Sequence, residues 1–498
     1  MKLLCHLPAA FYSISSSISS SNHRWRGSYS CLRRATSITA KSRHTSLGFR
    51  SSSSATHHRR HYHSHHRHHL FPCCHSTADN KIFHRHSALR QRRKHLHKSN
   101  TQNNKNVRHL ATSSDPDSIL RDKFSDVATA DTEITHQTPS FQLFYNDVYE
   151  VKLPPRHRFP MGKYKKVRER VQYLISKLPQ EKRESVNCEF HVSPLATFDE
   201  LSTTHDPTYI HRFLQGDQTE REQRNVGFPW SKEGVDRALS SVGGTLAAAC
   251  FVCEERRRQI RNNAESPERV RSPVPSWAAH IAGGTHHAFH DYGEGFSVFS
   301  DMAVTANVVL DRYPDVIKNN VLMIDLDVHQ GNGNAVLFQQ GNLNDESAIH
   351  RKHADRVFTF SMHCSGNYFS PKQESDLDIE LPIGCQDQAY LMTLNHWLKR
   401  FRIEHNREKT KHKMDLIIYQ AGVDVLEDDR LGRMNLSPEA VRRRNELVYE
   451  FARDLKLPLV ICMGGGYPKR DDAWKPIIEA HANVYFGAHQ FLSRLSKS

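Results

Sequence analysis

The segment Val321-Leu-Met-Ile-Asp-Leu-Asp-Val-His-Gln-Gly-Asn-Gly333 decides the fold and carries residues suited to chemistry. Residues 321–325 form a short, near-continuous apolar run that ends in an aspartate, which is typical of a strand buried on both faces of a parallel sheet. Asp327 and His329 follow at once, and open α/β sheets bind their ligands at the carboxyl ends of their strands. We therefore predict a buried parallel strand over residues 321–325 with a functional site at its end.

Three further apolar runs later in the chain end in the same way. They span residues 357–361, 416–420 and 457–461. The polar or glycine-rich segments that follow them are, in chain order, Ser361-Met-His363, Gly422-Val-Asp424 and Gly464-Gly-Gly-Tyr467. Because the carboxyl ends of parallel strands meet at one edge of a sheet, these segments are expected to lie together.

Segments with helical character separate the runs, for example residues 387–403 and 437–455. The second begins with Ser437 as an N-cap and Pro438 at the first helical position. Alternating strands and helices predict an α/β fold whose central, mostly parallel sheet is flanked by helices, with the active site at the carboxyl ends of the strands.

The N-terminal part of the chain has a different composition. Residues 1–110 hold 20 Lys and Arg against one acid, which leaves 49 basic and 53 acidic residues in the remainder, a net charge of −4. The basic, Ser/Arg/His-rich segment 1–138 is too poor in apolar residues to offset its ordering entropy, so we expect it to be disordered. Residues 139–492 are expected to form the catalytic domain, whose near-neutral charge indicates no direct binding of nucleic acid.

The first 78 residues contain no acid and are rich in Ser and Arg, the composition of an organelle transit peptide. This predicts a mitochondrial or plastid protein, with nucleus or cytoplasm as the alternative if the segment is only a basic arm. The histidine-rich residues 57–69 could bind a transition metal loosely, although low-complexity sequence is the favoured interpretation.

The ten cysteines have no regular spacing, which favours reduced structural thiols over a disulfide framework. No apolar stretch approaches the roughly 20 residues that a membrane-spanning helix requires, so no membrane span is expected.

Asp327, His329 and Asp424 could supply three protein ligands to one divalent ion. Catalytic zinc typically keeps three protein ligands and leaves one position open, and two carboxylates would also suit iron or manganese. In an extended chain the side chains of Asp327 and His329 lie on the same side, so both could point at one ion. Each aspartate alone could be a turn or cap residue, but the combination favours a metal centre.

His286 and His287 follow a pair of glycines and could act as base and acid toward a water beside the metal. Such histidines need partners that select a tautomer, and Asp325 and Asn332 are the candidates. A carboxylate on one ring and an amide on the other would separate the two pKa values. Tyr467, after three glycines, could donate to an oxyanion or simply pack at a strand end.

Four segments, in this order, resemble the histone deacetylase family. They are Ala282-Gly-Gly-Thr-His-His287, Ile324-Asp-Leu-Asp-Val-His-Gln-Gly-Asn-Gly333, Ala421-Gly-Val-Asp424 and Met463-Gly-Gly-Gly-Tyr467. The likeness covers roughly residues 141–490, includes His157-Arg-Phe-Pro-Met161 and Leu431-Gly-Arg-Met-Asn-Leu-Ser437, and is greatest toward class IV enzymes and their bacterial relatives.

The resemblance implies an arginase/deacetylase-like fold with Zn²⁺ held by Asp327, His329 and Asp424. It implies His287 as the main general base and acid, His286 as an electrostatic partner, Tyr467 as the oxyanion donor, and Asp325 and Asn332 as orienting residues. A structural K⁺ is implied at Asp325, Asp327, His329, Ser361 and Met362. The walls of a substrate tunnel are implied at Gly295, Phe296, Phe369 and Leu431.

The function implied is that of a zinc-dependent amidohydrolase, a protein lysine deacetylase acting on histones, as a chromatin regulator, or on other proteins. Alternatives are hydrolysis of acetylpolyamines, of another small acylated amine, or of long-chain acyl-lysine. A third possibility is a catalytically silent acyl-lysine-binding corepressor subunit, against which stands the complete set of site residues.

Overall fold

The structure, a computed structural model, describes residues 138–496 except 156, 266–274, 340–351, 368–369, 409, 411 and 471–472. These residues all belong to one compact unit of the chain. The segment expected to be disordered, apart from its last residue, lies outside the described residues, as does Phe369.

Eight strands form one sheet in which every neighbouring pair is parallel, which confirms the predicted α/β architecture. Their order across the sheet is β2-β1-β3-β8-β7-β4-β5-β6. The strands are β1 (Ser140–Tyr145), β2 (Asn187–Val192), β3 (Ser276–His280), β4 (Asn320–Asp325), β5 (Val357–Cys364), β6 (Leu377–Leu381), β7 (Met414–Gln420) and β8 (Leu459–Cys462).

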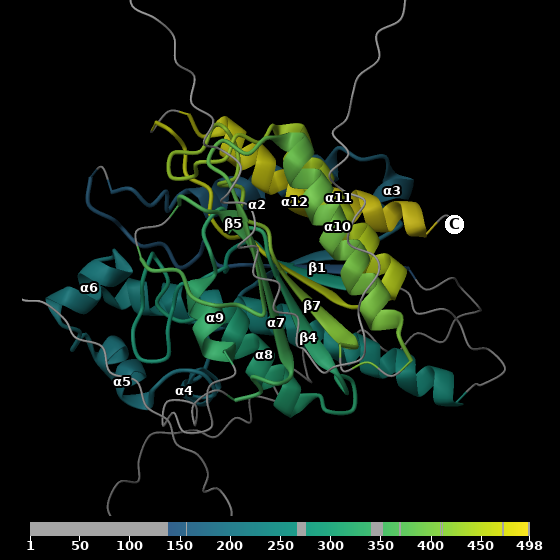
Figure 1. The fold of residues 1–498 in the computed structure, drawn as a ribbon, viewed down its shortest axis with the longest axis horizontal. Coiled ribbons are helices and arrows are strands. Elements are labelled where there is room, and N and C mark those ends of the chain that lie inside the picture. Colours follow the sequence, from purple (N-terminus) through teal and green to yellow (C-terminus); the bar gives the residue numbers. More distant parts are fainter. Residues whose placement is uncertain are drawn as a thin grey trace, which may run out of the picture. The chain divides into compact units, whose positions relative to one another are not determined.

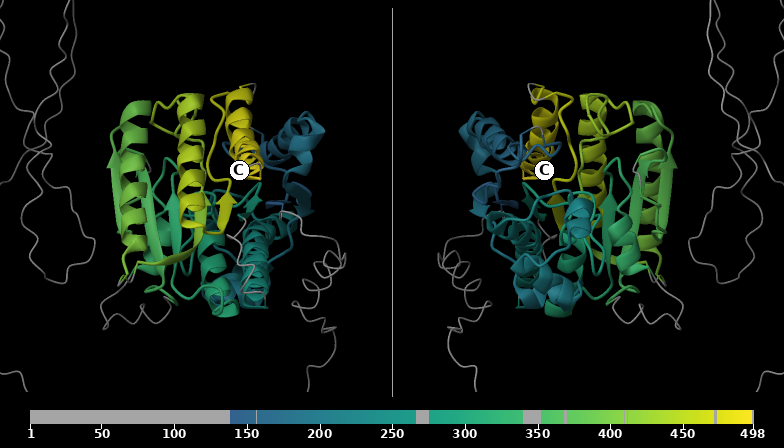
Figure 2. Two further views of the ribbon diagram at one scale, coloured as in Figure 1. Left: turned by 90° about the vertical axis from the view of Figure 1, so that its right-hand side faces the viewer. Right: turned by 90° about the vertical axis from the view of Figure 1, so that its left-hand side faces the viewer.

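Helices cover both faces of the sheet (Figures 1 and 2). On one face α2, α12, α11 and α10 pack side by side, and on the other α7 packs on α8 and α8 on α9. The helices are α2 (Lys163–Ser176), α3 (Gln180–Glu184), α4 (Phe198–Ser202), α5 (Pro207–Gln215), α6 (Glu220–Val226), α7 (Lys232–Glu265), α8 (Asp301–Arg312), α9 (Asn332–Phe338), α10 (Asp387–Asn406), α11 (Pro438–Leu455) and α12 (Lys475–Leu495).

The apolar run of β4 is continuous because its two faces belong to two different cores. Leu322 and Ile324 pack into the core under α10–α12, whereas Val321 and Met323 pack into the core under α7 and α8. Successive side chains of a strand point to opposite faces, so a strand covered by helices on both sides needs an apolar residue at every position. This is the physical reason for the pattern that predicted the sheet.

Three of the four predicted strands, β4, β5 and β7, lie where their apolar runs predicted them. The fourth run, residues 457–461, was placed too early, because β8 begins at Leu459. Pro458 has no N–H to donate to a ladder, and its carbonyl instead accepts from the N–H of Ile417 at 3.1 Å. The predicted start of α11 is confirmed: Ser437 Oγ accepts from the N–H of Ala440 at 3.1 Å, and Pro438 follows.

The long helix α7 corrects the expectation that no segment is apolar enough to span a membrane. By length and composition alone α7 would qualify, but 78% of its most apolar window is buried within the fold, as in the core helix of a globular domain. It packs against β1, β3 and β8. Among the described residues the six cysteines carry free thiols, in agreement with the predicted reduced state.

Candidate functional site

The segments predicted to meet at the carboxyl edge of the sheet do so. Asp327, His329 and Asp424 are buried, and one ligand atom of each lies within 4.8 Å of the others. His329 Nδ1 is 3.1 Å from Asp327 Oδ1 and 3.2 Å from Asp424 Oδ2. Neighbouring strands β4 and β7 supply these residues from loops at the same end, which is why positions almost a hundred residues apart converge.

The electrostatics of this group suit a bound cation. Burial, together with the charge of Asp327, raises the pKa of Asp424 to about 6, because two carboxylates are held close together away from water. Burial opposes a charge on His329, but the two aspartates outweigh it and raise its pKa to about 10. Asp424 Oδ2 is buried and accepts no hydrogen bond of standard geometry from the described residues. A divalent ion would balance the two carboxylates in place of the proton on His329.

Backbone groups fix the two carboxylates in place. Asp327 Oδ2 accepts from the N–H of Gly465 at 2.8 Å, and Asp424 Oδ1 accepts from the N–H of Val328 at 3.0 Å. Behind them the fully buried Arg444 of α11 donates to the carbonyls of Leu326, Ala421 and Gly422, at 3.2, 3.2 and 2.6 Å. Arg444 thereby ties together the loops that follow β4 and β7. It was not predicted, since its bonds go to backbone atoms.

Gly465 is required by the carboxylates beside it. A Cβ at this position would overlap Asp424 Oδ2 and lie 2.8 Å from Asp327 Oδ2. We therefore expect Gly465→Ala to displace both carboxylates and to weaken metal binding by at least the roughly 10- to 100-fold that loss of an outer-shell partner costs. Competition with a zinc chelator would measure this. Gly487→Ala, where a Cβ meets only Tyr449 at 3.8 Å, is the control and should bind metal normally.

The two histidines have the partners that the sequence suggested. His286 Nδ1 lies 2.7 Å from Asp325 Oδ2, and His287 Nδ1 lies 2.6 Å from Asn332 Oδ1, with the two rings 4.0 Å apart. Burial opposes a charge on His286, but Asp325 and Asp327 outweigh it and raise its pKa to about 9. Burial and the neighbouring charge of His286 lower the pKa of His287 well below its usual value. His286 is therefore the cationic ring and His287 the neutral one.

Asp301, at the start of α8, holds the loop that presents these histidines. Its buried carboxylate accepts from the N–H groups of Gly284 and Thr285 at 2.9 and 2.7 Å, and from Thr285 Oγ1 at 2.8 Å. Gly283 and Gly284 have φ of +73° and +82°, a conformation that favours glycine. Asp301 was not predicted, because an aspartate behind a serine at a helix start is ordinarily only a dipole partner.

Tyr467 is buried at the end of the glycine loop, where its N–H donates to Asp429 Oδ2 at 2.6 Å. Burial and then the charges of Asp424 and Asp327 raise its pKa well above the usual value, so the phenol keeps its proton and can donate it in a hydrogen bond. The carboxylates that act on Tyr467 are thus the predicted metal ligands.

Lys163 supports the same loop and was missed by sequence reasoning. Only 1% exposed, its Nζ donates to the carbonyls of Gly464 and Gly466 at 3.1 and 3.4 Å and lies 5.2 Å from the centre of the Tyr467 ring. Burial lowers the pKa of Lys163 to about 8 despite the nearby aspartates. In the sequence it resembles the solvated lysines beside it, because nothing local signals its burial.

Of the predicted tunnel residues, Phe296 lies 6.2 Å from the Tyr467 ring and has a φ of +66°. Gly295 donates its N–H to Asn225 at 3.1 Å, and Leu431 donates its N–H to Asp429 Oδ1 at 2.7 Å. Of the predicted K⁺ ligands, Asp325 lies opposite Ser361 in the β4–β5 ladder, and Met362 follows Ser361 on β5.

Known proteins with similar sequences cover this region. The family model described as the histone deacetylase domain matches residues 164–483. An uncharacterized protein of Picosynechococcus sp. is 34% identical over 329 residues, 66% of this chain and 93% of that protein. Histone deacetylase 2 of Arabidopsis thaliana is 29% identical over 250 residues, 50% of this chain and 51% of its own, so the chain spans about half of that relative.

Two solved structures are similar at lower identity. An HDAC homologue from Aquifex aeolicus has a TM-score of 0.49 and 18% identity, covering 70% of this chain and 84% of its own. The HD domain of HDA15 has a TM-score of 0.49 and 17% identity, covering 70% and 89%. Because the family model spans more than half of the chain, including every predicted metal ligand and both histidines, this chain belongs to the histone deacetylase family.

Proposed function

We propose that this chain is a zinc-dependent protein lysine deacetylase that hydrolyses the amide of acetyl-lysine, on histones or on other proteins. The observation that carries the proposal is the buried group Asp327, His329 and Asp424 beside two histidines with different partners. Membership of the histone deacetylase family supports amide hydrolysis. One imidazole and two carboxylates suit a catalytic zinc, and the resemblance adds a structural K⁺ between β4 and β5.

When bound, zinc would polarise the amide carbonyl and make an adjacent water a stronger acid. His287 Nδ1 donates to Asn332 Oδ1, so Nε2 carries the lone pair that takes the proton of the attacking water. His286, cationic beside Asp325, stabilises the negative charge that develops. Tyr467 donates to the oxyanion, and His287 returns its proton to the lysine amine as the C–N bond breaks.

We expect Tyr467→Phe to lower turnover of an acetyl-lysine peptide by roughly 100-fold while zinc content is unchanged, because one donor to the oxyanion is lost. Steady-state kinetics and elemental analysis of the same sample measure the two quantities. Tyr173→Phe, at a side chain that is 52% exposed, is the matched control. Unchanged turnover in Tyr467→Phe would refute the assigned role.

The competing functions are hydrolysis of acetylpolyamines or long-chain acyl-lysine and a silent acyl-lysine-binding role. The full-length protein loaded with zinc would be offered acetyl-lysine peptides, long-chain acyl-lysine peptides and acetylpolyamines. Preference for acetyl-lysine supports the proposal, and preference for acetylpolyamine replaces it. Binding of acetyl-lysine without cleavage of any substrate would favour the silent role.

We also propose that the acid-free N-terminal segment directs the chain to a mitochondrion or plastid. A fluorescent fusion carrying residues 1–110 tests this. Organelle fluorescence would make non-histone proteins the leading substrates. Nuclear fluorescence would contradict the proposed organelle targeting and make histones the leading substrates.

A further inference from the structure

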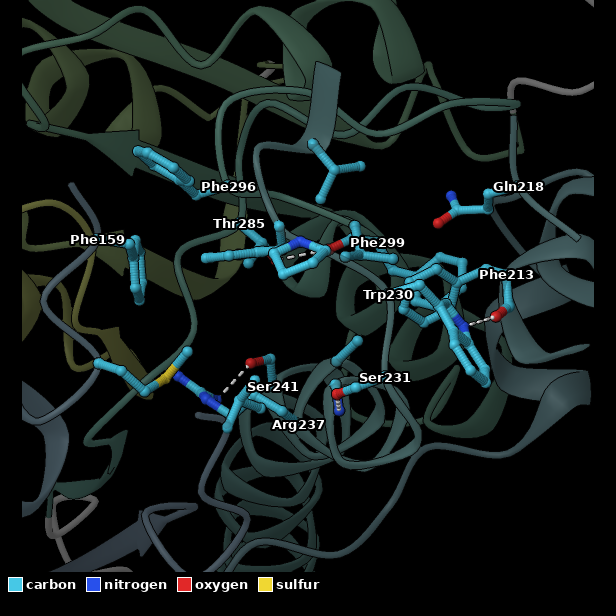
Figure 3. A pocket seen from close by; sticks show the side chains of 18 of the residues that line it. Phe159, Phe213, Gln218, Trp230, Ser231, Arg237, Ser241, Thr285, Phe296 and Phe299 are labelled. Carbon is cyan, nitrogen blue, oxygen red and sulfur yellow. Dashed lines mark hydrogen bonds between the residues drawn. The ribbon is translucent and has the colours of Figure 1, made fainter. Parts of the chain in front are cut away.

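A cavity of about 60 Å³ lies beside the catalytic residues, and no step of the proposed mechanism uses it. Figure 3 shows it from close by, with aromatic side chains on most sides. Phe159, Phe296, Phe299 and Trp230 give it largely apolar walls. Such a space takes a hydrocarbon group more readily than a hydrated one.

The cavity begins next to the site of amide cleavage. Thr285, which lines it, directly precedes His286. Phe159 and Phe296 also line it, and their rings lie 6.4 and 6.2 Å from the ring of Tyr467. An acyl group whose carbonyl is held near Tyr467 would therefore direct a longer chain toward this space.

Arg237 of α7 supplies a positive charge to the wall. It is 8% exposed, its guanidinium is stacked 4.1 Å from the centre of the Tyr164 ring, and Nη1 donates to Ser241 Oγ at 2.8 Å. No described carboxylate forms an ion pair with it: Asp147, the acid that acts on it over distance, is engaged by Arg168 at 2.8 Å through both oxygens. A guanidinium has five N–H donors, and burying its charge without a paired anion lowers the stability of the fold. An anion bound in the cavity would offset this desolvation penalty.

A donor without a partner lies elsewhere in the cavity wall. The Nε2 of Gln218 is buried and has no acceptor among the described residues. In Figure 3 Gln218 and Arg237 lie on opposite sides of the cavity. An apolar space with a buried arginine on one side and an unpartnered amide N–H on the other matches a ligand that has a hydrocarbon body and oxygen acceptors.

We propose that this cavity is an acyl pocket that binds a carboxylate, with Arg237 as the residue that selects an acyl group ending in an acid, such as glutaryl or succinyl on lysine. The proposal rests on the proposed function and specifies its substrate. Water adds to the amide carbonyl, the C–N bond breaks, the amine takes the proton, and the products are lysine and a dicarboxylate. Water is the one co-reactant.

The test compares acetyl-, hexanoyl- and glutaryl-lysine peptides on the full-length zinc-loaded protein and on Arg237→Met. Hydrogen bonds to a charged group are worth enough to predict a roughly 10- to 100-fold loss of kcat/KM for glutaryl-lysine in Arg237→Met, with acetyl- and hexanoyl-lysine unchanged. Arg237→Lys should recover part of the glutaryl activity. Arg170→Met, at an arginine of α2 outside the cavity that pairs with Glu479, is the control and should not alter the preference.

Equal losses for all three peptides would show that Arg237 only stabilises the fold, and would overturn the proposal. Cleavage of acetyl-lysine without cleavage of glutaryl-lysine would overturn the selection of acid-ended acyl groups and leave only a site for a free acid such as the released product. Calorimetry with free glutarate and acetate then decides, since Arg237→Met should abolish binding. Equal binding by wild type and variant overturns the carboxylate site, and this readout stands even if no peptide is cleaved.

Discussion

Replacing Asp424 by alanine is expected to remove the metal from the protein and with it the hydrolysis of acyl-lysine. Asp424 provides one of the two carboxylates in the group of three ligands, and its other oxygen fixes the backbone of Val328 at 3.0 Å. Loss of an outer-shell partner already costs roughly 10- to 100-fold in metal affinity, so loss of a direct ligand should exceed this. Elemental analysis and kinetics on an acetyl-lysine peptide would measure both effects.

Asp428→Ala is the control for this change. Asp428 lies four residues further along the same loop, is exposed, and forms one long ion pair with Lys469 at 3.8 Å. It should keep both zinc and activity. Full retention of zinc by Asp424→Ala would show that the ligand set is wrongly assigned. Loss of zinc from both variants would point to damage of the whole loop.

The second large effect is expected for His287→Ala, with a fall in kcat of roughly 10²- to 10⁴-fold, because the proton acceptor for water and the donor to the amine are the same ring. Zinc content should not change, since His287 is not one of the three ligands. His286→Ala should cost less, because this ring keeps its proton beside Asp325 and acts through its charge. Kinetics on zinc-saturated samples would rank the two variants.

An Asn332→Ala variant separates positioning from chemistry. Asn332 contacts His287 and is not one of the three ligands, so its loss should lower kcat less than His287→Ala does and leave zinc in place. A larger loss in His286→Ala than in His287→Ala would reverse the roles assigned to the two rings, and equal losses would indicate that the pair acts as one unit.

The chemistry of this site could be predicted from the sequence because it is concentrated at the ends of short apolar runs. The aspartates and histidine after β4, the aspartate after β7 and the tyrosine after β8 lie in segments whose order at one edge follows from a parallel sheet. Asp325 and Asn332 also followed as the partners of the two histidines, since each histidine needed a partner on a neighbouring loop; the structure shows which partner each ring has.

The residues that hold the site in shape could not be predicted in this way. Lys163, Asp301 and Arg444 act largely through backbone carbonyls and N–H groups far away in the sequence, and such bonds place no demand on the identity of the distant residue. A lysine at the start of an amphipathic helix or an arginine among other arginines normally indicates a solvated surface.

The sequence by itself determined the parallel α/β sheet, the edge at which ligands bind and the residue types that gather there, because burial on both faces and strand polarity are written into local patterns. The resemblance implied different roles for the two histidines, but the charge on each ring depends on how close it lies to Asp325 and Asp327, which only the tertiary structure gives. Tertiary structure also decided that Arg237 is buried beside an apolar cavity without an acid of its own. The burial of a side chain and the charges that surround it depend on how distant segments pack together, and the local sequence does not determine this packing.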